Sequence, residues 1–472
     1  MIYIDKNREE PLYLQIYNQV KNDIMDGSLK EGQILSGSRK TAGILHVSRN
    51  TVDNAYGQLA AEGYIAPVRG IGYAVTKLPP AIQPLTKPVQ KPRRIALPDR
   101  EHTAADITYD LTNGSHTGDL FPDRLWRRFT LEFLEQLHEN AKLSSLQDRQ
   151  GELFLRRQLL PYLRRIRGIN CTHSQIIVTS GIQHSLEILC KILAGPSAAV
   201  IMEEPGYHRA AAVFQNNGFQ IHTVPVDENG IITADLPCRQ DICVLYSTPS
   251  HQFPTGVTMP IGRRYELLQW AAAEGTYIIE DDFDSELRYY EKPIPSLQSI
   301  DENQQVIYLG TFSKTLSPAI RMGYMILPPQ LLELYQSKYL NYNCNVPLLN
   351  QYVVSRIIET GHYERHIRRL NHIFRKRLEQ FTYEFSPVRD KIKLSGNGSG
   401  QYFLLEFSDP TDQNTLIEQA LEHGVKVYST MQFWREKAAC PPNTLFLGFS
   451  KINLEDIPDC AARLKTAWAK WL

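Results

Sequence analysis

From residue 106 onward, short apolar runs alternate with stretches of helical periodicity, and this alternation limits the possible folds more than any other feature of the chain. Runs that are apolar on both faces and separated by helices predict a mainly parallel α/β sheet with helices on both sides. In such a sheet a ligand binds outside the strand ends, so the residues that follow each run form the candidate site. The predicted strands are 175–179, 199–202, 242–246, 276–280, 306–309 and 322–327.

The run at 306–309 is followed by small hydroxyl residues and a lysine, with Thr311, Ser313 and Lys314 in order. Burial at the rim of a sheet lowers the pKa of a lysine amine, and such a lysine suits Schiff-base chemistry. Pyridoxal phosphate is the cofactor that this arrangement suggests. A lysine after a strand is more often a solvated loop charge, so the other strand ends must decide between the two interpretations.

Other strand ends carry groups that suit the same cofactor. Gly181 and the two residues after it open a helix, whose free N–H groups and positive dipole end can bind a phosphate. The ring of Tyr207 can lie over a planar cofactor, and the carboxylate of Asp281 can pair with a protonated pyridine nitrogen. Each feature alone is common in α/β proteins, so only their order at successive strand ends indicates a site.

The first 76 residues predict a separate module. Apolar residues at helical spacing predict a helix over 12–26, and a short second helix is expected over 38–45. Ser48 is placed to cap a third helix that starts at Arg49. Two short helices joined by a tight turn are typical of a helix-turn-helix, and the alternating, glycine-containing segment 65–75 predicts a β-hairpin wing.

In a helix-turn-helix the second of the paired helices presents its first residues to base edges and phosphates in the major groove. A helical pair with a hairpin also occurs as a packing module, and the charges of this segment are balanced, so charge does not decide between the two. The predicted DNA contacts are Arg39, Lys40, Ser48, Arg49, Asn50, Thr51, Arg69 and Gly70.

Residues 77–105 predict a linker. They contain six prolines, which prevent regular helix or sheet and favour extended conformations. The basic residues of this segment either touch DNA phosphates or are simply solvated, and the second interpretation is the commoner one.

The bulk composition excludes several classes of protein. A formal net charge of zero argues against a general polyanion binder, so a nucleic-acid contact must come from a local surface. The seven cysteines are scattered, without the spacing of a metal site, which predicts free thiols in a reducing cytoplasm and no bound metal. No apolar stretch is long enough to cross a membrane, and no secretory signal begins the chain.

Two sets of motifs resemble known families. In the first 76 residues, G-x-x-L-x-x-S-R, V-S-R-N-T-V-x-x-A-Y-x-x-L-x-x-E-G-Y and R-G-x-G follow a helix in the order seen in GntR-type bacterial repressors. From residue 106 to 472, the ordered strand ends resemble fold-type-I pyridoxal-phosphate enzymes, the aspartate-aminotransferase superfamily. Joined in one chain, the two parts resemble the MocR/GabR family of bacterial transcriptional regulators.

The resemblance implies a multidomain fold. An α+β winged helix-turn-helix (1–76) and a proline-rich linker (77–105) would precede an α/β pyridoxal-phosphate transferase of fold type I (106–472) with a smaller C-terminal α/β subdomain. By resemblance, Lys314 forms the Schiff base, Asp281 faces the pyridine nitrogen and Tyr207 stacks on the ring. The other implied cofactor contacts are Gly181, Ile182, Gln183, His251, Thr311, Ser313 and Arg321, and the implied effector contacts are Arg209, Gln432 and Arg435.

Several positions depart from the pattern of the superfamily. Phe283 stands where a tyrosine commonly donates to the cofactor O3′, and Ile182 stands where a hydroxyl residue often holds the phosphate. Leu146 replaces a tyrosine that often reaches the phosphate of the partner subunit. Gln432 lies near the place of a carboxylate-binding arginine, with Arg435 as the alternative. These changes keep the cofactor anchors but remove groups that speed proton transfer, so we expect sensing rather than turnover.

The expected function is that of a cytoplasmic, pyridoxal-phosphate-dependent transcriptional regulator. It would bind operator DNA as a homodimer, head-to-tail swapped, and sense an amino acid, a dipeptide or another amine. Three alternatives stay open: a working aminotransferase with an accessory DNA-binding head, a regulator that senses pyridoxal phosphate itself, and a repressor whose large domain is only a dimerisation scaffold.

Overall fold

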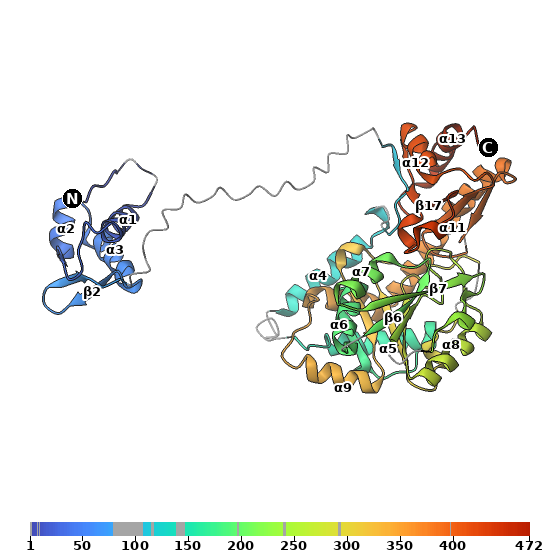
Figure 1. The fold of residues 1–472 in the computed structure, drawn as a ribbon, viewed down its shortest axis with the longest axis horizontal. Helices are drawn as coiled ribbons and strands as arrows, with labels where there is room; N and C mark the ends of the chain where they lie inside the picture. The colour runs from blue at the N-terminus through green and yellow to red at the C-terminus, as the bar shows by residue number, and fades with distance from the viewer. Residues whose placement is uncertain are drawn as a thin grey trace. The chain divides into compact units, whose positions relative to one another are not determined.

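The structure is a computed structural model that describes residues 2–6, 8, 10–78, 107–114, 118–137, 147–195, 198–238, 242–290, 294–396 and 398–472. The chain divides into two compact units, Met1–Arg100 and Glu101–Leu472, which we call the head and the large unit (Figure 1). Apart from Lys77 and Leu78, the predicted linker lies outside the described residues.

The head is built from three helices and a small antiparallel sheet. Its strands pair in the order β1-β3-β2. Apolar side chains from all three helices meet in one core, with Ile16 and Val20 of the first helix against Val52 and Leu59 of the third. The elements are α1 (Leu12–Met25), β1 (Ile34–Leu35), α2 (Ser38–Leu45), α3 (Arg49–Ala61), β2 (Ile65–Val68) and β3 (Gly72–Val75).

Local chemistry sets the start of the third helix. The Ser48 hydroxyl accepts a hydrogen bond from the Thr51 N–H at 3.1 Å, which satisfies one of the free donors of the first turn. His46 adopts φ = 50° directly after α2, which turns the chain between the two helices. In the hairpin, Gly70 has φ = 77°, a conformation that favours glycine. The predicted helix-turn-helix and wing are confirmed.

An eight-stranded sheet forms the centre of the large unit, in the order β5-β12-β11-β10-β9-β6-β7-β8. The neighbours from β11 to β7 are parallel, whereas β12 is antiparallel to both β11 and β5, and β8 is antiparallel to β7. The strands are β5 (Ile176–Thr179), β6 (Ala199–Glu204), β7 (Gln220–Asp227), β8 (Gly230–Ile231), β9 (Ile242–Ser247), β10 (Tyr277–Asp282), β11 (Val306–Thr311) and β12 (Gly323–Ile326).

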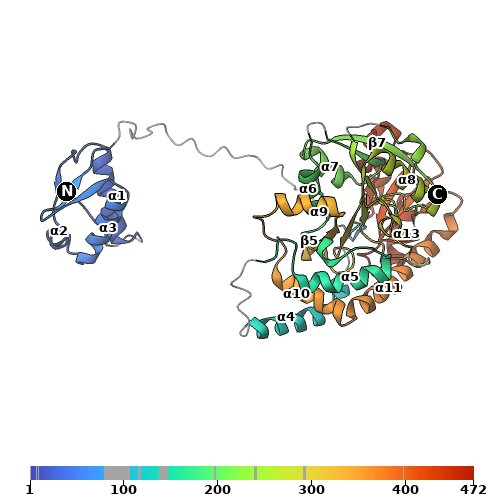
Figure 2. The ribbon, with the colours of Figure 1, turned by 90° about the horizontal axis from the view of Figure 1, so that it is seen from below.

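Helices cover both faces of this sheet, because its strands are apolar on both sides. On β5, Ile177 packs in a core with residues of α6, α7 and α9, whereas its neighbour Ile176 packs in a core with residues of α5 and α10. Figure 2 shows these two helix groups on opposite sides of the strands. The helices are α4 (Asp123–Leu137), α5 (Leu153–Arg167), α6 (Ile182–Leu193), α7 (His208–Asn216), α8 (Ile261–Glu274), α9 (Pro329–Lys338) and α10 (Leu348–Glu359).

The C-terminal part forms a smaller α/β subdomain with its own core, as expected (Figure 1). Its four strands pair in the order β13-β14-β17-β16, and β15 pairs with β4, which precedes the first long helix of the large unit. The elements are β4 (Tyr109–Asp110), α11 (His362–Phe385), β13 (Ile392–Ser395), β14 (Tyr402–Phe407), α12 (Gln413–Glu422), β15 (Val425–Lys426), β16 (Tyr428–Ser429), β17 (Thr444–Gly448) and α13 (Ile457–Ala467). Among the described helices, none is long and apolar enough to span a bilayer.

Candidate functional site

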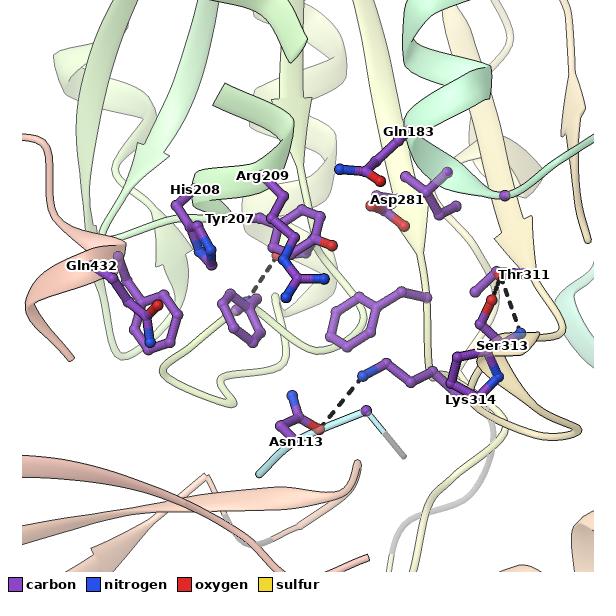
Figure 3. A pocket seen from close by; sticks show the side chains of 18 of the residues that line it. Asn113, Gln183, Tyr207, His208, Arg209, Asp281, Thr311, Ser313, Lys314 and Gln432 are labelled. Carbon is purple, nitrogen blue, oxygen red and sulfur yellow. Dashed lines mark hydrogen bonds between the residues drawn. The ribbon is translucent and has the colours of Figure 1, made fainter. Parts of the chain in front are cut away.

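A cavity of about 300 Å³ opens at the carboxyl ends of the central parallel strands (Figure 3). Residues after β5, β6, β10 and β11 line it on one side, and residues of the smaller subdomain and of segment 112–114 line it on the other. Strand ends meet there because parallel strands all deliver their last residues to the same edge of the sheet. The cavity therefore lies where the sequence places its candidate residues.

Lys314 lies in this cavity, three residues after the end of β11. Burial lowers the pKa of its amine, an effect that the carboxylate of Asp284 opposes and the guanidinium of Arg209 strengthens. Its Nζ donates a hydrogen bond to Asn113 Oδ1 at 3.4 Å and lies 5.7 Å from the centre of the Phe283 ring. An amine with a lowered pKa in an aromatic surrounding is a suitable nucleophile toward a carbonyl group.

Asp281 stands at the end of β10 with one carboxylate oxygen bonded and the other free. Its Oδ2 accepts a hydrogen bond from the Tyr246 hydroxyl at 2.5 Å. Its Oδ1 is buried and has no partner among the described residues. Burial raises the pKa of this carboxyl to about 7, against the lowering effect of the Tyr246 hydrogen bond. A protonated pyridine nitrogen would supply the donor that Oδ1 lacks, so the residue fits pyridoxal phosphate.

The raised pKa predicts a pH-dependent effect of Asp281→Asn on the cofactor-free protein. An unfolded aspartate loses its proton near pH 4, whereas buried Asp281 keeps it up to about pH 7. The stability that the neutral carboxyl contributes is therefore complete below about pH 4 and is lost as the pH rises through about 7. We expect the free energy of unfolding of Asp281→Asn, relative to that of the unchanged protein, to rise by about 2 kcal/mol between pH 5 and pH 8. Thermal unfolding at both pH values measures this, and a pH-independent difference would contradict it.

The start of α6 and its neighbours form a cradle for an anion. Gly181 has φ = 97° and precedes the helix, whose first N–H groups have no acceptor within the helix and no side-chain cap. The guanidinium of Arg321 lies against it, since a Cβ on Gly181 would be 3.5 Å from Arg321 Nη2. The same Nη2 donates to the Ser180 carbonyl at 3.0 Å.

Hydroxyl groups complete this cradle from β11. Thr311 and Ser313 both line the cavity, and the Ser313 N–H donates to Thr311 Oγ1 at 3.1 Å. Helix N–H groups, two hydroxyls and a guanidinium are the donor set that proteins use for a phosphate. The residues present thus fit the phosphate of the suggested cofactor as well as its ring nitrogen.

The remaining predicted residues divide between this cavity and its surroundings. Tyr207, Arg209 and Gln432 line the cavity. Arg435 instead lines a neighbouring cavity of about 350 Å³, because its backbone N–H is held by Glu204 Oε1 at 2.6 Å. His251 is buried beside Asp284, with Nδ1 2.9 Å from Asp284 Oδ2, and is not among the lining residues. Leu146 lies outside the described residues.

The structure also adds residues that the strand-end pattern did not single out. Tyr246 belongs to a predicted strand, but nothing in the sequence indicates that its hydroxyl reaches Asp281. Asn113 is 201 residues away from Lys314 in the chain and belongs to no motif. Phe253 and Phe433 line the cavity from two distant segments. Only the folded chain brings these side chains together.

In the head, three of the predicted DNA contacts, Arg39, Lys40 and Arg49, line one groove. A shallow groove is lined by Gly37, Ser38, Arg39, Lys40 and Arg49, at the N-terminal ends of α2 and α3. Arg49 Nε lies 3.3 Å from Asp53 Oδ2 one turn later, which orients an otherwise exposed side chain.

The other predicted DNA contacts lie at the start of α3 or on the wing. Ser48 and Asn50 are exposed at the start of α3, and Thr51 is half-buried. Arg69 and Gly70 are exposed at the hairpin turn between β2 and β3. The head thus presents a recognition helix and a wing, as a winged helix-turn-helix requires.

Both units of the chain are similar in sequence to known protein families. The family of bacterial regulatory proteins named gntR matches residues 12–75, and the family Aminotransferase class I and II matches residues 117–436. The HTH-type transcriptional regulator YhdI of Bacillus subtilis is 35% identical over 99% of this chain and 98% of its own. The probable rhizopine catabolism regulatory protein MocR of Rhizobium meliloti is 30% identical over 99% of this chain and 96% of its own.

Solved aminotransferases share the fold of the large unit. The kynurenine aminotransferase of Pyrococcus horikoshii superposes with a TM-score of 0.69 and 26% identity, covering 78% of this chain and 92% of its own. The α-aminoadipate aminotransferase LysN of Thermus thermophilus, solved in complex with N-(5′-phosphopyridoxyl)-L-leucine, gives a TM-score of 0.68 at 25% identity, covering 78% and 93%. The predicted fold class is confirmed, and the central sheet is mixed where a mainly parallel one was expected.

Proposed function

Since the chain belongs to the MocR-type family of transcriptional regulators, in which a gntR head precedes an aminotransferase class I and II domain, we propose that its large unit binds pyridoxal 5′-phosphate and senses a small amine. The head would bind operator DNA, and the ligand would change the affinity of the protein for that DNA. Such a change is limited by the difference in ligand affinity between the two states of the protein.

Asp281 and Lys314 support the binding of pyridoxal phosphate more strongly than any other feature of the cavity. Asp281, whose buried Oδ1 has no partner among the described residues, lines the same cavity as Lys314. When bound, pyridoxal phosphate supplies an aldehyde that condenses with primary amines and a ring that accepts electron density. Lys314 would hold the cofactor covalently, Asp281 would hold the ring nitrogen and Tyr207 would cover the ring. The α6 start, Thr311, Ser313 and Arg321 would hold the phosphate.

Two features of the cavity favour ligand binding over turnover. Phe283, beside the lysine, has no hydroxyl with which to hold or move a proton. Gln432 lines the cavity where a charged side chain would clamp a carboxylate more strongly. Positioned proton-transfer groups typically contribute about 10²- to 10⁴-fold to a rate, so their loss weakens catalysis far more than it weakens binding.

A working aminotransferase is the second candidate, because the large unit matches that enzyme family and keeps the lysine, the aspartate and the arginine of the site. We expect steady-state turnover below about 0.1 s⁻¹ with any pair of amino donor and keto acid, about 100-fold below a typical enzyme. A coupled assay on the cofactor-loaded protein measures this, with Lys314→Ala as the background. Sustained turnover of several per second would support the enzyme instead.

The proposal includes a homodimer, head-to-tail swapped, whose two heads would contact two half-sites of the operator. Titration with pyridoxal phosphate, followed by retention of an upstream DNA fragment with and without amines, tests the proposal as a whole. A visible cofactor band and an amine-dependent change in DNA affinity are expected. A change caused by pyridoxal phosphate alone would indicate a sensor of the cofactor. A protein that stays colourless, yet dimerises and binds DNA, would indicate a scaffold.

A further inference from the structure

We propose that the sensed ligand is a primary amine with an apolar, preferably aromatic body and at most one anionic group, which Arg209 binds. The inference rests on the proposed function and specifies the chemical class of its ligand. Phenylalanine rings line the cavity beside Lys314, and Arg209 is the positively charged residue among the described lining residues that belongs neither to the phosphate cradle nor to the Schiff base.

Four phenylalanine residues line the cavity, and their rings form what we call its wall: Phe253, Phe283, Phe433 and Phe446. Phe253 is at their centre, with its ring centroid 4.9 Å from that of Phe433, 5.9 Å from Phe446 and 6.0 Å from Phe283. Phe253, Phe433 and Phe446 are buried members of one apolar cluster. The wall thus offers a ligand continuous apolar surface, which favours an apolar body.

This wall adjoins the reacting nitrogen. Lys314 Nζ lies 5.7 Å from the centre of the Phe283 ring, and Phe253 packs edge-on against Tyr207, the predicted cover of the cofactor, at 5.5 Å. A ligand whose amine takes the place of the lysine amine must therefore place its next atoms against Phe283 and Phe253. An aromatic ring attached one or two carbons from the ligand amine would pack face-to-face or edge-to-face against the phenylalanine rings of the wall.

Two of the three tyrosines that line the cavity, Tyr246 and Tyr428, do not make this wall polar. The hydroxyl of Tyr246 donates to Asp281, and the hydroxyl of Tyr428 donates to Asp110 Oδ1 at 2.7 Å. Both hydroxyls are already used within the protein, so these two residues offer the ligand mainly their rings.

Positive charge is scarce in this part of the cavity. Among the lining residues that the structure describes, the lysine and arginine residues are Arg209, Lys314 and Arg321, and Arg321 belongs to the phosphate cradle. His208 also lines the cavity, but burial lowers the pKa of its imidazole, so it is neutral at pH 7. Gln432 is uncharged. Apart from the reacting amine, Arg209 is left as the partner for one anionic group.

Among the described lining residues, a second anionic group would have no cationic partner and would lie near the phenyl rings. Burying an unpaired carboxylate costs several kcal/mol, and the cost is larger than the gain from any contact with neutral amides. The cavity therefore discriminates against amino dicarboxylic acids and in favour of ligands that combine one amine, one ring and no more than one acid.

Three pairs of ligands test this on the full-length, cofactor-loaded protein. Each pair compares racemic phenylalanine with one other ligand. Racemic alanine lacks the ring, racemic glutamate has a second acid in place of the ring, and 2-phenylethylamine lacks the acid. Affinity is measured by the change in cofactor absorbance and, independently, by titration calorimetry. Phenylalanine is expected to bind at least about tenfold more tightly than alanine and glutamate. Equal or tighter binding of glutamate would overturn the inference.

Two variants identify the anion partner. Arg209→Gln is expected to weaken phenylalanine binding about tenfold while leaving 2-phenylethylamine within about twofold. Arg365→Gln, which removes the same charge from an exposed position of α11, is the matched control and should change the binding of neither ligand. Equal loss for both ligands in Arg209→Gln, or a loss in Arg365→Gln alone, would overturn the role of Arg209. Failure of the unchanged protein to take up pyridoxal phosphate would overturn the proposed function itself, whereas an inverted ligand ranking on a coloured protein overturns only the inference.

Discussion

Replacing Lys314 with alanine is expected to abolish the visible absorbance band that pyridoxal phosphate gives with the protein. The amine of Lys314 is the lining group that can bond covalently to the cofactor aldehyde, and burial holds its pKa below that of a free lysine. The other contacts of the cavity stay in place, so non-covalent binding of the cofactor should persist at much lower affinity. An absorbance titration of the full-length protein measures both effects.

The control for this variant is Lys393→Ala, which removes an exposed lysine of β13 in the smaller subdomain. It should keep the band and the cofactor affinity. DNA binding by Lys314→Ala in the absence of ligand should also be unchanged, because the head has its own core. An unaltered visible band in Lys314→Ala would refute the assignment of this lysine.

Replacing Arg49 with alanine is expected to weaken binding to an upstream DNA fragment by about 10- to 100-fold. Arg49 stands at the first position of α3, is exposed and is oriented by Asp53 at 3.3 Å. Its loss removes a contact from the recognition helix and also lowers the dependence of affinity on salt. Fluorescence anisotropy at two salt concentrations measures both quantities.

Arg365→Ala is the matched control, because it removes an exposed arginine from α11 in the large unit. This variant should bind DNA as the unchanged protein does. If Arg49→Ala kept full affinity and the full salt dependence, the recognition surface would have to lie elsewhere on the head.

Much of the head was predictable because its signals are local. The Ser48 hydroxyl caps α3 through a residue three positions away, and Gly70 turns the hairpin within four residues. Helix caps and hairpin turns depend on neighbouring residues and need no long-range contact. The predicted helix over 38–45 accordingly agrees with α2 at both ends.

The central sheet was predictable in its strands but less so in their directions. The run at 322–327 forms β12, which is antiparallel to both neighbours. A short apolar run predicts a buried strand but does not indicate the direction of that strand in the sheet. β7 was not predicted, since its residues alternate between exposed, half-buried and buried positions and include polar Gln220 and His222. Its place near the edge of the sheet leaves it without a continuous apolar run.

The anchors of the site were visible at strand ends, but the walls of the cavity were not. Lys314 follows β11 and Asp281 lies near the end of β10, and a short apolar run in the sequence indicates each of these strands. Phe253 and Phe433 come from segments 180 residues apart and meet at 4.9 Å only in the folded chain. Gln432 lines the cavity and Arg435 lines only the neighbouring one, a difference that no motif reveals.

Chemistry at Lys314 is expected to change DNA binding by a separate unit of the chain. To test this, the affinity for an upstream DNA fragment is measured with and without a bound amine, in the cofactor-loaded protein and in Lys314→Ala. We expect a change of at least about fivefold in the unchanged protein and none in the variant, since coupling of this kind is typically about 5- to 150-fold. An equal response in both proteins, or no response in either, would contradict it.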